Sequence, residues 1–409
     1  MKHVIPAILA TAAIVTIFGT ASRADARSMQ PSDFQRIVGL SAPAISPDGK
    51  RAVVVVSKIV WNDDTYASDL DLIDVATHAR RTITHDRKDL DTPAFSPDGT
   101  KLAFLADAGA GDDAQPQVWV MRFDGGDPRS ITSAADGVQQ FAWRPDGNSV
   151  AYTASDPKPK LTGADRFRDS FLFTTEPITA RSMPRPAHLF VIASDGGKAK
   201  QLTFGAQSVA TAEAQSTISW SADGKTIAYT VTPNAILNDT VQSHIELVDV
   251  ATDRISRLTQ HDEYESNPLY SPDGRHIAYE FARGDGQSNQ VEALVTTPAG
   301  GEGDAASQSC DCYVNDLAWL SDSSGILITA ANHTSQELLR VGLTGSTEAM
   351  PLDDLRIGSP LQGAVASDGG MVYVASTVKR PAELYYRAKS GVAVRLTGYN
   401  DAIAGLDLA

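Results

Sequence analysis

The sequence predicts an all-β protein, a seven-bladed β-propeller built from four-stranded antiparallel blades. Three observations lead to this fold: one short phrase recurs along the chain, its copies lie about 50 residues apart, and each copy is followed by a second pair of strand-like segments. The clearest copy reads FSPDGTKLAFLAD at residues 95–107. A unit that returns at this interval is typical of propellers and solenoids.

The repeated phrase occurs in five clear copies and two degenerate ones. The turn aspartates of the seven copies are Asp48, Asp98, Asp146, Asp223, Asp273, Asp322 and Asp368. Successive aspartates are separated by 50, 48, 77, 50, 49 and 46 residues. The one long interval therefore holds one unit plus an insertion of roughly 28 residues.

The turn in each copy has a physical explanation. In Ser-Pro-Asp-Gly the proline presets φ for a turn, the aspartate accepts backbone N–H bonds, and the glycine adopts positive φ without steric cost. A calcium loop needs several oxygen ligands in one short segment, whereas each turn supplies one aspartate. We therefore expect Asp48, Asp98, Asp146, Asp223 and Asp273 to be structural, and we expect no metal and no cofactor.

The segments after each turn alternate large and small side chains. Leu102 and Phe104 flank Ala103, a period of two that indicates a strand packed on both faces. Each unit then continues into a second hairpin that ends in a Leu-Thr or similar pair, as in HLFVIASDGGKAKQLT from His188. Two hairpins make one blade.

Since no strand is left over, we expect the ring to close by packing between the first and seventh blades, without a blade shared by both chain ends.

The charge of the chain limits the classes of partner. A formal net charge of −15 argues against nucleic acid and anionic lipid, because both attract a basic surface. We therefore expect a peptide or protein partner.

The first residues have the pattern of a signal peptide. Met1 to His3 form a positive start, residues 4–18 are apolar, and Ala24 to Ala26 offer small residues at a cleavage site. We expect residues 1–26 to direct export to the periplasm or beyond and to leave no membrane span after cleavage. An uncleaved anchor is the alternative.

The remaining boundaries follow from local patterns. Residues 27–40 are predicted to form a helix with Ser32 as N-cap and Gln35 as its capping-box partner. The propeller is expected over 41–400, followed by a tail at 401–409. The insertion, at about 156–187 in the third unit, is either a functional loop or a decorated surface hairpin; we expect it to project from the ring with Phe167, Phe171 and Phe173 on one side.

The two cysteines, Cys310 and Cys312, lie on the loop that leads into the sixth unit. A strained bridge and two free thiols both remain open. Zinc would need further ligands at a recognisable spacing.

The segment SAPAISPDGKRAVVV after the expected helix, followed by units with GG…LT endings, resembles the N-terminal propeller of bacterial serine peptidases of the prolyl oligopeptidase family, notably the acylaminoacyl-peptidase and dipeptidyl-aminopeptidase-like branch. The Ser-Pro-Asp-Gly repeat is also similar to the periplasmic Tol-system propeller. The first resemblance implies a propeller that caps an α/β-hydrolase domain and selects the peptides that reach it. The second implies a free-standing propeller that binds a protein or envelope partner.

No catalytic residue is assigned. The hydrolase nucleophile needs Gly-x-Ser-x-Gly on a strand-to-helix turn, and neither this pentapeptide nor a strand-helix alternation occurs in the 409 residues. We therefore expect the chain to be non-catalytic as given, with the hydrolase half lost or carried on another chain.

The resemblance to the dipeptidyl branch suggests a search for peptide-binding residues. That branch holds a peptide amino terminus with paired glutamates, but no Glu-Glu occurs here. The candidates in the insertion are the lone carboxylate Glu176 and the guanidinium groups of Arg166 and Arg168. The two arginines would either hold a peptide carboxylate or pair with Asp165 and Asp169.

Overall fold

The computed structural model describes residues 27–403 and residue 406, except for residues 86, 110–113, 124, 168–169, 171–182, 211–215, 262–263, 283–290, 311 and 333–334. The expected signal peptide at 1–26 lies outside the described residues. None of the helices in the described part of the chain has the length and apolar character needed to cross a bilayer.

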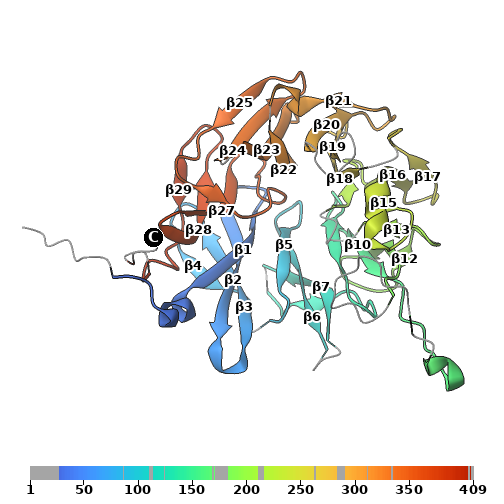
Figure 1. Cartoon of the computed structure of the whole chain (residues 1–409), viewed down its shortest axis with the longest axis horizontal. Helices are drawn as coiled ribbons and strands as arrows, with labels where there is room; N and C mark the ends of the chain where they lie inside the picture. Colours follow the sequence, from blue (N-terminus) through green and yellow to red (C-terminus); the bar gives the residue numbers. More distant parts are fainter. Residues whose placement is uncertain are drawn as a thin grey trace, which may run out of the picture.

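The described strands form seven antiparallel sheets arranged around a central axis, which confirms the predicted seven-bladed propeller (Figure 1). The first strand of each sheet lies near the centre, as β1, β5, β18 and β22 show, and the last strand lies at the rim, as β17, β21 and β25 show. Six sheets have four strands, and the fourth sheet has five because its first strand is split into β13 and β14.

The strands of blades 1 to 4 have the following bounds: β1 (Val38–Ile45), β2 (Arg51–Val60), β3 (Thr65–Asp74), β4 (Arg80–Thr82), β5 (Asp91–Phe95), β6 (Lys101–Ala108), β7 (Gln115–Arg122), β8 (Arg129–Ser130), β9 (Gln140–Trp143), β10 (Ser149–Ser155), β11 (Ala187–Ala193), β12 (Lys200–Gln201), β13 (Ser208–Val209), β14 (Ser219–Trp220), β15 (Thr226–Thr232), β16 (His244–Asp249) and β17 (Ile255–Arg257).

Those of blades 5 to 7 are β18 (Glu265–Tyr270), β19 (Ile277–Ala282), β20 (Val291–Thr296), β21 (Asp304–Ala305), β22 (Tyr313–Trp319), β23 (Gly325–Asn332), β24 (Ser335–Gly342), β25 (Thr347–Met350), β26 (Arg356–Ile357), β27 (Met371–Thr377), β28 (Arg380–Arg387) and β29 (Ala393–Arg395). Short 3-10 helices interrupt the connections: η1 (Pro31–Arg36), η2 (Trp61–Asp63), η4 (Gly163–Phe167), η6 (Leu237–Gln242) and η7 (Ala306–Ser309).

The Ser-Pro-Asp-Gly turns are held by the side chains that the motif supplies. In the first blade the Ser46 hydroxyl donates to Asp48 Oδ1 at 2.6 Å, and the same oxygen accepts the Lys50 N–H at 3.2 Å. Gly49 has a φ of 70°, which a residue with a Cβ rarely adopts. In all seven turns the aspartate accepts the N–H of the residue two positions on. The motif therefore closes the first hairpin of each blade.

A tryptophan just before the turn joins neighbouring blades. The indole N–H of Trp143 donates to Ala94 O at 3.0 Å, and that of Trp220 donates to Ala142 O at 3.2 Å. Trp319 bonds to Leu269 O in the same way at 2.8 Å. Each indole thus satisfies a carbonyl on the first strand of the preceding blade while its ring fills the space between the sheets.

The Leu-Thr endings also have a structural cause. The fourth strands are only two to four residues long, so they leave N–H groups of the third strand without a ladder partner. The threonine hydroxyl accepts one of them: Leu70 N–H bonds to Thr84 Oγ1 at 2.7 Å, and Leu384 N–H bonds to Thr397 Oγ1 at 2.9 Å. The threonine hydroxyl thus supplies the acceptor that a carbonyl of a longer fourth strand would otherwise provide.

The ring closes as predicted, without a blade shared by the two chain ends. The first sheet contains only β1 to β4 and the seventh only β26 to β29, and β1 packs against β27 and β28. After the last strand, the Asn400 carboxamide accepts the Val38 N–H at 2.9 Å and donates to Val38 O at 3.0 Å. One amide side chain therefore fastens the end of the chain to the first strand.

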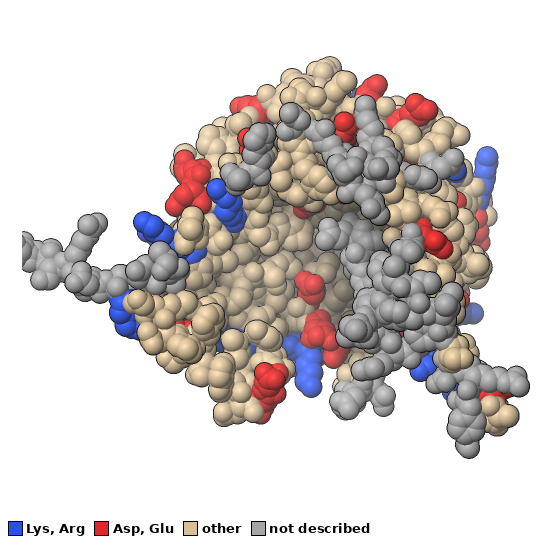
Figure 2. Space-filling view, in the orientation of Figure 1, with Lys and Arg blue, Asp and Glu red and all other residues tan. Residues whose placement is uncertain are grey.

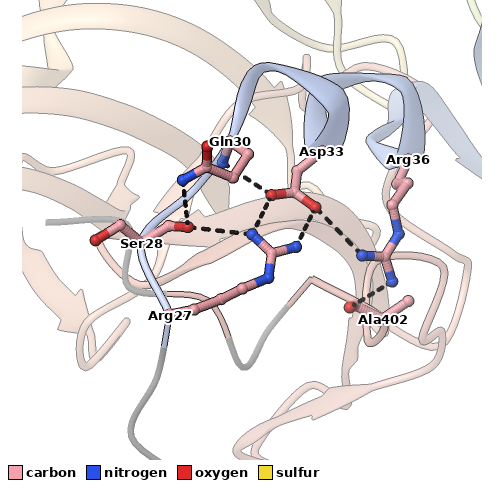
Figure 3. A network of polar contacts seen from close by, with 6 residues as sticks. All are labelled: Arg27, Ser28, Gln30, Asp33, Arg36 and Ala402. Carbon is pink, nitrogen blue, oxygen red and sulfur yellow. Dashed lines mark hydrogen bonds and ion pairs between the residues drawn. The ribbon is translucent and has the colours of Figure 1, made fainter.

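The segment before β1 differs from the predicted helix over 27–40. It forms only the 3-10 helix η1, and β1 already begins at Val38. Ser32 is not the cap: Gln30 precedes the helix, and its N–H donates to Asp33 Oδ2 at 2.9 Å (Figure 3). Asp33 is the stronger anchor because Arg27 and Arg36 both contact its carboxylate, at 2.6 and 3.3 Å.

This segment also contacts the other end of the chain. Arg27 holds the pKa of Asp33 well below its usual range through their hydrogen bond. Arg36 donates to Ala402 O at 3.0 Å. The two ends of the described chain therefore lie side by side, as Figures 1 and 3 show.

The two cysteines are joined in a Cys310–Cys312 disulfide. This answers the question that the sequence left open.

Candidate ligand channel

The first strands of the blades surround an axial channel that contains two chambers. We call the first the aromatic chamber. It has a volume of about 500 Å³, lies at the end of the channel that carries the Ser-Pro-Asp-Gly turns, and is lined by rings and prolines that include Trp143, Trp220, Tyr270, Trp319 and Pro272. The second, the polar chamber, has a volume of about 550 Å³ and lies toward the starts of the first strands. Figure 2 shows the hollow at the centre of the ring.

The polar chamber is lined by groups that bind polar ligands. They include the carboxylates of Asp91, Glu280 and Asp316, the carboxamides of Gln140, Asn267, Gln336 and Gln362, and the hydroxyls of Thr217, Thr329 and Ser359. The lining contains no lysine, arginine or histidine among the described residues. Such a chamber offers both donors and acceptors to the amide groups of a peptide.

β-Bulges interrupt several of the first strands that line the polar chamber. The pairing of the first and second strands shifts in register at Ser41/Ala44, Asp91/Ala94 and Ser266/Leu269. Within the bulges, Ala42, Thr92 and Asn267 have φ values of 43°, 51° and 56°, and each precedes a proline. Bulges and non-glycine residues at positive φ are concentrated at functional sites.

Asn267 is the centre of the polar network. Its Oδ1 accepts the Thr217 hydroxyl at 2.6 Å and the Gln362 carboxamide at 2.9 Å. Its Nδ2 donates to Glu280 Oε1 at 3.1 Å. This buried side chain thereby connects blades 4, 5 and 7 at the chamber wall.

Two carboxyl groups of the polar chamber have raised pKa values. Burial raises the pKa of Glu280 to about 7, against the hydrogen bond from Asn267, and the neighbouring Asp316 raises it further. Burial also raises the pKa of Asp316, although the N–H groups of Leu361 and Leu317 stabilise its charged form. The chamber therefore holds two carboxyl groups that take up protons more readily than exposed carboxylates do.

The polar chamber opens on the face of the ring that carries both chain ends, which we call the terminal face. β1 begins there at Val38, and Asn400 bonds to Val38. The connections between second and third strands, including the insertion, leave the same face because strands alternate in direction. Nine of the twelve exposed large apolar residues of the described chain lie in segments that leave it: Phe34, Trp61, Tyr66, Leu161, Met183, Phe204, Val241, Tyr313 and Val378.

The candidate residues predicted from the sequence lie away from this network or outside the description. The backbone of Arg166 lies in η4, which projects from the ring in Figure 1, whereas Arg168 and Glu176 lie outside the described residues. Phe171 and Phe173 also lie outside them. The ligand role of these three candidates therefore stays a prediction.

The base of the insertion is firmly attached. Asp156 N–H bonds to Pro186 O at 2.9 Å. Arg185 forms an ion pair with Asp136 at 2.6 Å. The two ends of the insertion are therefore fixed to blade 3.

Sequence reasoning missed Asn267, Glu280 and Asp316. The sequence did contain a pattern that marks the position of Asn267, because APAISPDG, TPAFSPDG and NPLYSPDG share a proline two residues after the bulge begins.

The described part of the chain has no cluster of three or more His, Cys, Asp or Glu residues that would suit a metal ion.

Comparison with known proteins adds the family context. The family model of the TolB β-propeller domain matches residues 23–169. Dipeptidyl-peptidase 5 of Porphyromonas gingivalis is 26% identical over 355 residues, which cover 82% of this chain and 50% of that protein. The uncharacterized peptidase YuxL of Bacillus subtilis is 26% identical over 254 residues, 60% of this chain and 30% of that protein. The chain spans half or less of the length of these relatives.

Solved structures agree on the fold. Pyrococcus horikoshii acylaminoacyl peptidase superposes with a TM-score of 0.68 at 18% identity, over 92% of this chain and 55% of that one. The propeller domain of the Pyrococcus furiosus trilobed protease, described as having an open velcro topology, superposes with a TM-score of 0.62 at 16% identity, over 89% of this chain and 99% of that one.

The sheets define the class of the protein as a seven-bladed β-propeller, and residues 23–169 match the TolB propeller model. In sequence the chain is similar to dipeptidyl-peptidase 5, and in fold it is similar to the propeller of acylaminoacyl peptidase. The resemblance predicted from the sequence is confirmed.

Proposed function

We propose that this chain is the non-catalytic, peptide-admitting propeller of an exported serine peptidase of the prolyl oligopeptidase type. Its catalytic partner is an α/β-hydrolase unit supplied from outside these 409 residues. The amino-terminal signal pattern supports export to the periplasm or beyond.

The main support for this proposal is the terminal face. It gathers exposed apolar side chains such as Trp61, Tyr66 and Val378, which are 60, 65 and 86% exposed. Exposed apolar groups that gather on one face favour a protein–protein contact, because burying them releases ordered water. The same face carries both chain ends and the mouth of the polar chamber, so a hydrolase docked there would receive what the chamber holds.

The polar chamber supports a peptide as the ligand. A peptide main chain offers alternating N–H donors and C=O acceptors. Carboxylates at Glu280 and Asp316 accept from N–H groups, while carboxamides such as Gln140 both donate and accept. Because the lining is free of described cationic side chains, it favours peptide segments that carry no negative charge.

The test has two steps. The purified chain is first treated with a serine-reactive fluorophosphonate probe, and we expect no labelling, since the sequence lacks the nucleophile motif. The DNA after the codon for Ala409 and the neighbouring reading frames are then searched for an α/β-hydrolase with Gly-x-Ser-x-Gly. Stoichiometric labelling of the chain that one Ser→Ala change abolishes would overturn the non-catalytic assignment.

A second candidate function rests on the match of residues 23–169 to the TolB propeller model. In that case the terminal face binds an envelope protein, and no hydrolase is involved. The absence of a neighbouring hydrolase, together with a stable complex between the chain and one envelope protein that Trp61→Ser and Tyr66→Ser weaken, would favour this alternative.

A further inference from the structure

A third cavity lies on the terminal face beside the polar chamber, and we call it the lateral pocket. It has a volume of about 580 Å³ and is lined by residues from the start of β3, the end of β6 and the start of β7. Asp91 and Gln139 line both the lateral pocket and the polar chamber. The two cavities therefore adjoin, and one extended ligand can contact both.

Apolar side chains form a large part of the wall of the lateral pocket. Leu90, Leu105 and Val138 line it and are buried, and Pro116 lies beside them in the lining. The ring of Tyr66 also lines the pocket and is 65% exposed, so a ligand can reach it. Such a wall suits a side chain with an aliphatic stem and a planar end group, because both pack well on apolar and aromatic surfaces.

Two buried acceptor atoms of the lateral pocket have no hydrogen-bond partner among the described residues. They are Asp107 Oδ1 and Gln139 Oε1. The carboxamide nitrogen of Gln139 is satisfied, because it donates to Ser155 Oγ at 3.1 Å. Since buried acceptors are normally paired, these two oxygens favour a ligand that brings N–H donors.

The charge of the lining favours a cation. The described lining contains the carboxylates of Asp89, Asp91 and Asp107 and one cationic side chain, Lys88. Burial raises the pKa of Asp107, and the neighbouring Asp89 raises it further, although Lys88 acts in the opposite direction. The charged form of Asp107 is therefore not fully compensated by the protein, and a positive group in the pocket would stabilise it.

We propose that the lateral pocket binds the arginine side chain of a peptide whose main chain enters the polar chamber. This inference rests on the proposed peptide-admitting function and adds a preference for basic peptides to it. A guanidinium group keeps its charge and offers several N–H donors in one plane, enough for both Asp107 Oδ1 and Gln139 Oε1. An acidic or aliphatic side chain in the same place leaves both oxygens unpaired.

The test compares two peptides by isothermal titration calorimetry with the purified chain at low ionic strength. One is N-acetyl-Ala-Ala-Arg-Ala-Ala-amide, and the other has citrulline in place of arginine. Citrulline is a neutral isostere that keeps N–H donors, and the blocked ends remove the charges of the peptide termini. We expect the arginine peptide to bind about tenfold more tightly, because hydrogen bonds to a charged group are stronger than neutral ones.

Two variants of the pocket remove one carboxylate each without changing its shape. They are Asp107→Asn and Asp89→Asn, and Asp89 has a φ of 46°, which asparagine tolerates. The matched control is Asp63→Asn, because Asp63 is exposed on the same face and does not line the pocket. We expect both pocket variants to lose most of the preference for arginine and to keep the wild-type affinity for the citrulline peptide and the wild-type thermal midpoint. The control should keep the preference.

Three results would contradict the proposal in different ways. Equal affinity of wild type for the two peptides overturns the arginine site and leaves the proposed peptide function standing, whereas binding of neither peptide overturns both. A preference that persists in both pocket variants and is removed by Glu280→Gln also overturns the proposal, because the guanidinium group would then lie in the polar chamber.

Discussion

Glu280 allows a quantitative test of the electrostatics of the polar chamber. Its pKa rises from an ordinary value of 4.5 to about 7, chiefly because burial disfavours the charged form. Below pH 4.5 the group is protonated in the folded and the unfolded chain. Between pH 4.5 and 7 the folded protein keeps a proton that the unfolded chain releases, so the free energy of unfolding falls as the pH rises.

The size of this loss of stability follows from the difference between the pKa values of Glu280 in the unfolded and the folded chain. Each pH unit over which the two states differ by one proton is worth about 1.4 kcal/mol, so ionised Glu280 costs at most about 3.5 kcal/mol of stability above pH 7. Glu280→Gln removes this cost and keeps an oxygen for the bond from Asn267 Nδ2. For a chain of this length, about 3.5 kcal/mol corresponds to about 4 °C in the thermal midpoint.

The assay is thermal unfolding of wild type and Glu280→Gln from pH 4.5 to 8.5, followed by circular dichroism. We expect the midpoints to coincide near pH 4.5 and the variant to be more stable by about 4 °C above pH 7.5. Glu348→Gln, which alters an exposed residue of β25, serves as the control and should show no such divergence. A variant that is less stable than wild type at pH 8 would refute the reasoning.

Three further predictions concern single side chains and the whole chain. Asn400→Ala should lower the free energy of unfolding by about 2 kcal/mol, because it removes the buried carboxamide that pairs with two partly buried main-chain groups of Val38. Urea unfolding measures this, and the same change at the exposed Asn148 should have almost no effect. Trp220→Phe should cost about 1 kcal/mol through the lost bond to Ala142 O, and an unchanged urea midpoint would contradict it. The chain alone should hydrolyse no peptide or ester, and turnover that survives repurification would count against this.

The fold was largely predictable because the information is local and repeated. Each Ser-Pro-Asp-Gly turn and each Leu-Thr ending uses side chains within one blade, such as Ser46 with Asp48 and Leu70 with Thr84. A short helix was predicted before β1 and is present as η1, but its cap and length were mispredicted because Ser32 matched a capping pattern. The actual anchor is Asp33, whose carboxylate accepts the Gln30 N–H and pairs with Arg27 six residues earlier, and the helix ends early because the chain is extended from Val38 onward.

The candidate site was not predictable from the same patterns. Asn267, Glu280, Asp316 and Gln362 come from three blades, and apart from the proline that follows Asn267 they belong to no repeated motif. They meet because β18, β19, β22 and the segment after β26 all line the polar chamber. Only the closed ring brings such residues together.

The docking of a hydrolase on the terminal face is the central claim, and one measurement tests it most directly. The α/β-hydrolase that the proposed function requires is purified, and its affinity for the propeller and its rate of peptide hydrolysis are measured with wild type and with Trp61→Ser/Tyr66→Ser. Ile255→Ser/Val392→Ser, exposed residues on the opposite face, is the matched control. We predict that the first pair weakens binding tenfold or more and removes the effect of the propeller on peptide selection, while the control pair changes neither. Equal binding by all three proteins, or no binding by wild type, would contradict the account.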